Sequence, residues 1–453
     1  PLLLGMLCLT FDERGDFPQK RADLYHQALD TLLIQWDESR NIERDAMRKA
    51  EIYHELSLGR KNQMFAHIAH TTFEQGEIFI PQEQLESLLT NYLITIPNAP
   101  ARIDIAPAAI LRAIESQHGI LVEYAHGVYA FLHPTFQEYY AAHYMVTQDE
   151  DGDVEFIPYL LSHVHEDRWR EVILLTASML SNADAFFMCF LITLESLIHA
   201  HVQLVSFFAW VKRKEVTVQG LYSPEATRAY YVWLALALDY NHHWDRDRIL
   251  DRTRVLALDC AFALDHTLAS ALSRTLSLEI QPGRVHGRAL DRNLALDRAL
   301  ALILDRNRIL DRDLALILDR NRILDRDLAS VLHLKRNPAL DFTRARTLNR
   351  DIARSRADDL GFAKLATALN TLDVPEEEAS ETVWSPFANQ LRALMIQNRN
   401  VGHNWNFTEE QAVTLEKYFR AVTLLVQCLD VAHITDHVAV KTCLLLPPGD
   451  KET

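Results

Sequence analysis

The residues best suited to ligand binding or proton transfer lie in the stretch FLHPTFQEYYAAHY, residues 131–144. Here His133 stands between a run with strand character and a run with helical character. An imidazole at such a junction can donate a hydrogen bond to a phosphate oxygen, and protonation would add charge to that bond. The same side chain can instead be a structural group bonded to a nearby carbonyl. The residue types alone leave both interpretations open.

The elements on either side of His133 follow from local signals. Two short β-prone runs flank Ala125-His126-Gly127, and the glycine supplies the positive φ that a tight hairpin needs. Pro134 fits the first turn of a helix, where a missing N–H costs nothing. The sequence therefore predicts a β-hairpin that leads through His133 into a helix.

An aromatic set follows Pro134 at helical spacing: Phe136, Tyr139, Tyr140 and Tyr144. We interpret these rings as core residues rather than as the lining of a cofactor site. We expect Gln137 and Glu138 to form a local hydrogen-bonding pair.

Other histidines could be imagined as metal ligands, in His67-x-x-His70 and in His163-x-His165-Glu166. The first pair lies on a predicted helix, one turn apart, without a nearby carboxylate or cysteine. We therefore predict no metal site. No G-x-x-x-x-G-K-[ST] and no Gly-x-Ser-x-Gly occurs in the chain, so we predict no catalytic residues and no phosphoryl transfer by this chain alone.

The composition narrows the classes of partner. The chain has 453 residues, 49% of them hydrophobic, and a net charge of −16, which predicts three or more packed units and argues against nucleic-acid binding. The five cysteines are scattered without a CxxC pair, as in a reducing cytoplasm. No apolar stretch reaches the length of a membrane span. Because the start, PLLLGMLCLTF, has no Met and no signal-peptide flanks, we expect a fragment of a longer protein.

The order of predicted elements indicates a mainly α protein with one small β-hairpin. Three helices followed by a two-stranded wing is the order of a winged-helix domain. Predicted regions are a helical domain at 1–59, a winged-helix domain at 60–147, a helical linker domain at 148–244, helical repeats at 245–345 and a helical bundle at 346–453. In the last region, Thr408 and Gln411 match a capping box.

The repeats have a period of fourteen: ALILDRNRILDRDL at 301–314 recurs unchanged at 315–328. Fourteen residues make four turns at 3.5 residues per turn, which places Ile303, Leu310, Ile317 and Leu324 along one seam. The Asp and Arg residues between them form either a solvated face or a docking face for a partner.

The stretch FLHPTFQEYYAAHY resembles the end of the winged-helix domain in NACHT-type NTPases of the STAND class, where the phrase is close to F-x-H-x-x-F-Q-E-Y-x-A-A. The matching positions are Phe131, His133, Phe136, Gln137, Glu138, Tyr139, Ala141 and Ala142. PLLLGMLCLTFDERGDFPQKRADLY resembles the start of the helical domain that follows the NACHT core. The Leu-Asp-Arg repeats and NVGHNWNFTEEQ resemble the C-terminal helical region of bacterial, especially cyanobacterial, NACHT proteins.

This resemblance implies a regulatory function. NACHT proteins hold ADP in a closed state, exchange it for ATP when a trigger is sensed, and oligomerise, and bacterial members act in anti-phage defence. By resemblance, His133 reaches the β-phosphate of ADP and Pro1 packs near the adenine. The P-loop and the Mg²⁺ site would then belong to an upstream core, so the full-length protein would be an ATPase while this fragment alone binds no nucleotide. The implied location is cytoplasmic, and the trigger would be an unidentified protein.

Two other functions compete with this interpretation. The chain could be a stand-alone α-helical scaffold whose repeats bind another protein without any nucleotide. It could also be a winged-helix DNA-binding protein, but the candidate recognition helix, APAAILRAIESQHG, carries only Arg112 as a basic residue. The nucleotide hypothesis predicts that residues 131–144 form a strand and then a helix, with His133 at the surface.

Overall fold

The computed structural model describes residues 20–39, 55–96, 106–147, 156–217, 224–237, 362–373 and 381–450, and isolated residues at 5, 8, 11, 18, 53, 351, 354 and 355. The chain divides into two compact units: Pro1–Phe190 with Gln427–Thr435, and Leu191–Val426 with Asp436–Thr453. Pro1 and the repeats predicted at 245–345 lie outside the described residues.

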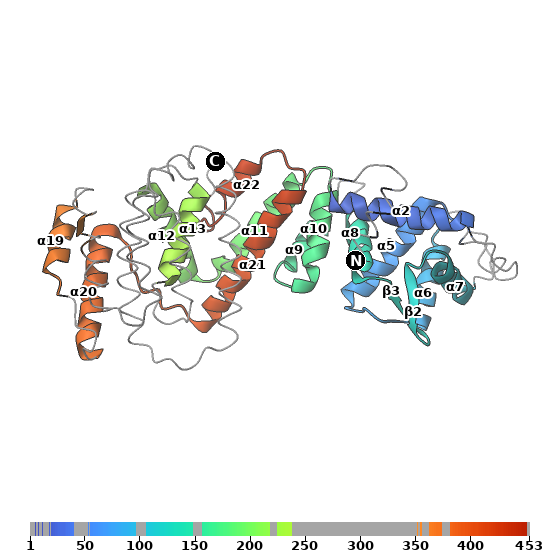
Figure 1. The fold of residues 1–453 in the computed structure, drawn as a ribbon, viewed down its shortest axis with the longest axis horizontal. Coiled ribbons are helices and arrows are strands. Elements are labelled where there is room, and N and C mark those ends of the chain that lie inside the picture. Colours follow the sequence, from blue (N-terminus) through green and yellow to red (C-terminus); the bar gives the residue numbers. More distant parts are fainter. Residues whose placement is uncertain are drawn as a thin grey trace. The chain divides into compact units, whose positions relative to one another are not determined.

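The first unit contains a winged helix (Figure 1). Its elements in chain order are α2 (Arg21–Ser39), α5 (Leu58–Glu74), β1 (Ile80–Pro81), α6 (Gln82–Ile94), α7 (Pro107–Gln117), β2 (Leu121–Ala125), β3 (Val128–Phe131) and α8 (Pro134–Thr147). They are followed by α9 (Phe156–Ser162), the 3-10 turn η2 (Asp167–Trp169) and α10 (Arg170–Met179). The mainly α fold class predicted from the sequence is confirmed.

The hairpin forms as the sequence predicts. Gly127 adopts a φ of 69° between β2 and β3, a conformation that a side chain would disfavour. The short strand β1, which the sequence did not predict, pairs antiparallel with β3 and gives a sheet of order β1-β3-β2. Along β2, the backbone N–H of Glu123 donates to the Glu115 carboxylate of α7 at 2.9 Å.

The core of the winged helix lies between α5 and α8, which pack against each other. Phe65 of α5 and Tyr140 of α8 are fully buried, and their ring centroids are 5.5 Å apart. The predicted aromatic core is confirmed for Phe136, Tyr139 and Tyr140, while Tyr144 is only half-buried. Burying a side chain of this size stabilises the fold by about 1.5–3 kcal/mol. Helices α2 and α10 pack on the other sides of α8.

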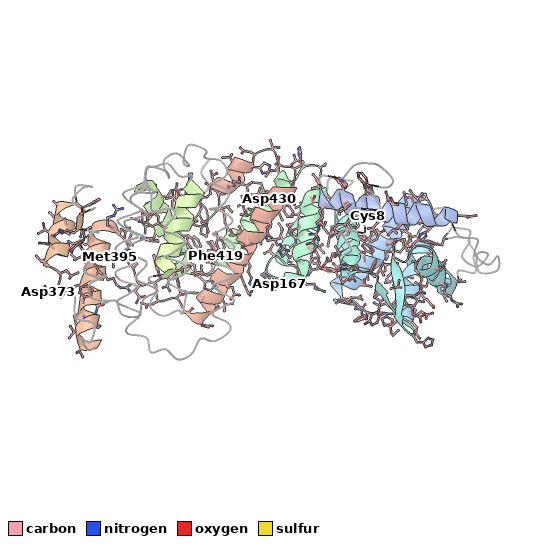
Figure 2. All side chains as sticks on the ribbon, in the orientation of Figure 1. Cys8, Asp167, Asp373, Met395, Phe419 and Asp430 are labelled. Carbon is pink, nitrogen blue, oxygen red and sulfur yellow. The ribbon has the colours of Figure 1, made fainter. Side chains whose placement is uncertain are left out.

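The described residues of the second unit form helices and the turns and loops between them. Its elements, of which α11 and α21 also extend into the first unit, are α11 (Asp184–His199), α12 (Val202–Thr217), α13 (Pro224–Ala237), α19 (Ala363–Thr371), α20 (Glu381–Arg399), α21 (Glu409–Val431) and α22 (His437–Thr442). The predicted capping box at the start of α21 is confirmed, because Gln411 N donates to Thr408 Oγ1 at 3.2 Å and Thr408 N donates to Gln411 Oε1 at 2.9 Å. Met395 of α20 and Phe419 of α21 are labelled in Figure 2, and both are fully buried.

Two buried cations connect distant segments of this unit. Arg228 of α13 has no exposed surface, and its guanidinium donates to Leu444 O at 2.8 Å, Thr442 O at 2.6 Å and Glu215 Oε2 at 2.5 Å. Lys214 of α12 donates to the backbone oxygen of Arg399 at 2.8 Å. These bonds connect the C-terminal ends of α20 and α22 to helices α12 and α13.

Among the described helices, none alone has the length and apolar character of a membrane span. Helix α11 and the Val202–Val216 part of α12 reach that length and apolar character only as a pair, across a bend of 119°.

Candidate functional site

The candidate site is the junction between β3 and α8, where Leu132 and His133 connect the two elements. Leu132 N donates to Ile120 O at 2.9 Å, so the strand-like pairing continues to the last residue before the histidine. The side chains of Leu132, His133 and Pro134 are all exposed. The predicted order of strand and helix, and the predicted surface position of His133, are therefore both confirmed.

The His133 imidazole has a defined orientation because it caps α8. The ring Nδ1 accepts a hydrogen bond from Thr135 N at 3.2 Å, and the backbone oxygen of His133 accepts one from Phe136 N at 2.9 Å. A neutral imidazole that accepts at Nδ1 carries its proton on Nε2. The Nε2–H group can then donate to an acceptor outside the chain.

At the start of α8, an anion would meet one side-chain N–H donor, that of His133. It would not meet several free backbone N–H groups. Pro134 has no N–H, and the next two backbone N–H groups, of Thr135 and Phe136, are bonded to His133. The positive end of the helix dipole still favours a negative charge there. This geometry fits a single contact between the Nε2–H of His133 and a phosphate oxygen.

Gln137 holds the first turn of α8 in place. Its amide Nε2 donates to Thr72 Oγ1 and to Glu77 O, both at 2.9 Å, and the side chain is buried. The expected local pair of Gln137 with Glu138 is therefore wrong, because burial turns the amide toward the end of α5. One turn further along, Tyr140 OH donates to Asn62 Oδ1 at 3.1 Å. These contacts fix α8, and His133 with it, on α5.

The Glu138 carboxyl has a raised pKa whose causes the sequence did not reveal. Burial raises the pKa of this carboxyl to about 7, the Glu171 carboxylate adds to this rise, and the Arg21 guanidinium opposes it. Arg21 Nη1 lies 2.8 Å from Glu171 Oε1. The three residues come from α8, α10 and α2, so no spacing within one helix could have indicated them.

His67 and His70 of α5 make packing and polar contacts with neighbouring side chains. His70 stacks on Tyr144 with centroids 4.2 Å apart, and its Nε2 lies 3.2 Å from Glu74 Oε1. Glu74 corrects the expectation that no carboxylate lies near this pair. Burial lowers the pKa of both His67 and His70.

The second histidine motif is also part of a packed structure. His163 stacks on Trp169 with ring centroids 4.3 Å apart, and its Nδ1 lies 2.7 Å from Glu166 Oε1. That hydrogen bond lowers the pKa of the Glu166 carboxyl. In the part of the chain that the structure describes, no group of three or more His, Cys, Asp or Glu residues could hold a metal ion.

Comparison with known families gives two matches. Residues 21–145 match the winged helix-turn-helix domain C-terminal to NACHT, and residues 363–447 match NACHT C-terminal helical domain 2. The chain carries a NACHT-associated C-terminal region. No curated protein and no solved structure matches the chain.

The two matches cover the winged helix and the C-terminal helices. The first ends within α8, so it includes the hairpin, His133 and the whole FQEYYAA phrase. The second begins at α19 and ends after α22. Neither match is a nucleotide-binding core, which agrees with a chain that lacks a P-loop.

Proposed function

We propose that this chain is the regulatory and sensor portion of a NACHT signal-transduction NTPase of the STAND class, and that it closes over ADP or ATP bound by an upstream core. His133 donates from Nε2 to the β-phosphate of ADP and so favours the closed form. The observation that carries this proposal is the exposed imidazole at the start of α8, with Nδ1 occupied by Thr135 N–H and Nε2 directed away from that bond.

The remaining parts of the proposal rest on the resemblance to NACHT proteins. The upstream core supplies the P-loop and the Mg²⁺ site, so the full-length protein is an ATPase although this chain has no P-loop of its own. Pro1 packs near the adenine. A protein trigger releases the closed form, the molecules oligomerise, and the response is a cytoplasmic, NLR-like innate defence against phage.

The test measures ADP retention by the protein that joins this chain to its upstream core. In His133→Ala we expect ADP release to be faster by about tenfold to hundredfold, because a hydrogen bond to a charged acceptor contributes about 1.5–3 kcal/mol. His126→Ala is the matched control, since His126 is a fully exposed histidine of the same domain, on the hairpin. Unchanged ADP retention in His133→Ala would remove His133 from the nucleotide site.

Two further variants separate the ring nitrogens. The amide of His133→Gln places an N–H donor near the position of Nε2, whereas that of His133→Asn places one near Nδ1. We expect His133→Gln to retain ADP better than His133→Asn. The reverse order would contradict the assignment of Nε2 as the donor.

A further inference from the structure

The outer face of the winged-helix sheet is apolar. The inner face packs on the core through four buried residues: Ile80, Leu121, Tyr129 and Phe131. Side chains alternate between the two faces of a strand, so the outer face consists of Phe79, Val122, Tyr124 and Ala130, which we call the wing face. An antiparallel sheet with one face on the core usually presents polar side chains on the other.

Two aromatic rings form the centre of the wing face. The ring centroids of Phe79 and Tyr124 lie 4.8 Å apart. Because β1 and β2 lie on opposite sides of β3, the rings meet over β3, where Ala130 is only 6% exposed. The rings themselves stay 52% exposed at Phe79 and 70% exposed at Tyr124. Adjoining exposed apolar side chains of this size are typical of an interaction surface.

Carboxylates flank the wing face. Glu77 comes two residues before Phe79, Glu123 directly precedes Tyr124, and Glu115 Oε1 accepts from Glu123 N at 2.9 Å. In the described part of the chain, these three carboxylates accept hydrogen bonds from amide groups, and none of them is paired with a lysine or an arginine. A partner that covers the rings can therefore bring positive charges to these carboxylates.

The surrounding domain has the same sign of charge. Residues 55–96 and 106–147 contain eight glutamates and three lysines or arginines, and one of these cations, Lys61, is buried. Nucleic acid and anionic lipid would be repelled by such a surface. A second copy of the chain would bring the same negative charge. The charge therefore favours a cationic protein segment.

We propose that the wing face binds a basic amphipathic helix of a partner protein, which packs apolar side chains on Phe79 and Tyr124 and turns lysine or arginine side chains toward Glu77 and Glu123. A helix can present an apolar and a basic stripe side by side, because residues three and four apart share a face. The inference does not depend on whether His133 contacts a nucleotide.

The test uses a synthetic amphipathic peptide of leucine and lysine, roughly 18 residues or about five helical turns long. Binding of the fluorescently labelled peptide to the full 453-residue chain is measured by anisotropy. We expect binding to weaken about tenfold in Tyr124→Ser, because aromatic residues at the centre of an interface contribute most of the affinity. Glu77→Gln should weaken it less, about threefold, because flanking charges contribute less than central rings.

Matched controls separate the wing face from general adhesion. Ile94→Ser removes a similarly exposed apolar side chain at the end of α6, and this variant should bind the peptide as wild type does. A peptide with glutamate in place of lysine should not bind. Phe79→Ser should reproduce the loss seen in Tyr124→Ser, and circular dichroism checks that both variants are folded.

Several results would overturn the proposal. These are no binding of the leucine–lysine peptide, equal binding of the glutamate peptide, or affinity that Tyr124→Ser and Phe79→Ser leave unchanged or that Ile94→Ser lowers equally. Self-association of the wild-type chain in sedimentation, lost in Tyr124→Ser, would assign the wing face to a second copy instead. Loss of peptide binding when the chain is joined to its upstream core would assign it to that core.

Discussion

In both the winged helix and the C-terminal helical region, buried polar side chains donate hydrogen bonds to backbone oxygens of distant segments. We call these side chains anchors, and the anchors described here differ in charge. In the winged helix, the neutral amide of Gln137 donates to Glu77 O at 2.9 Å. In the C-terminal region, the cations of Arg228 and Lys214 donate to backbone oxygens of Leu444, Thr442 and Arg399. The donor of this winged-helix anchor is uncharged, whereas the two donors in the C-terminal region carry a positive charge.

The difference determines how each region responds to damage. A buried cation has lost its hydration. Removing either the cation or its partner leaves a buried charge uncompensated, which lowers the free energy of unfolding strongly. A buried amide has a smaller desolvation cost, and its loss is correspondingly milder. The C-terminal region should therefore be the more sensitive to single substitutions.

The largest effect is expected from Arg228→Met. The substitution removes three donated bonds and leaves the Glu215 carboxylate, 15% exposed, without this guanidinium. We expect the free energy of unfolding of the second unit to fall by about 3–5 kcal/mol, measured by urea denaturation. Arg213→Met, at an exposed position on α12, should change it by less than about 0.5 kcal/mol. Equal effects of the two variants would contradict the role given to the buried cation.

A smaller effect is expected from Gln137→Leu in the winged helix. The variant leaves Glu77 O without this amide donor in a buried place, at a cost of about 1–3 kcal/mol in the free energy of unfolding of the first unit. Gln84→Leu is the control, because Gln84 donates to the Glu77 side chain from a partly exposed position. If Gln137→Leu cost as much as Arg228→Met, the distinction between neutral and charged anchors would fail.

The smallest effect is expected from Thr408→Ala at the start of α21. The capping box is local and exposed, so its loss should lower the free energy of unfolding of the second unit by about 1 kcal/mol. Thr408→Ser keeps the hydroxyl and should restore most of that loss. A serine variant as unstable as the alanine variant would show that the methyl group, rather than the cap, stabilises this helix end.

Much of the local structure around His133 could be predicted because its signals lie within a few residues. Gly127 marks the hairpin, Pro134 marks the helix start, and the aromatic spacing marks the buried face of α8. Strand β1 has only two residues, and its pairing with Tyr129 and Val128 joins positions far apart in the sequence. No pattern within so short a strand could predict it.

The candidate site was predictable in position but not in its supporting contacts. The sequence placed His133 at the surface between strand and helix, but the bond from Thr135 N to Nδ1 depends on the cap geometry of α8. Gln137 finds its partners on α5 and beyond, and the charges that act on the Glu138 carboxyl come from α2 and α10. Such contacts depend on how helices pack, which helical periodicity does not specify. The roles of His133 and Pro1 in binding nucleotide, and the five predicted domain ranges, stay predictions.

The Glu115 carboxylate that accepts from Glu123 N bears on how copies of this chain could assemble. An outer strand with unsatisfied donors invites a neighbouring chain to extend its sheet. Here that donor is already engaged within the molecule, and the same Glu123 side chain accepts from Gly127 N at 2.8 Å. A strand added at this position of the wing would first have to break that internal bond, so the wing edge is protected against strand addition there.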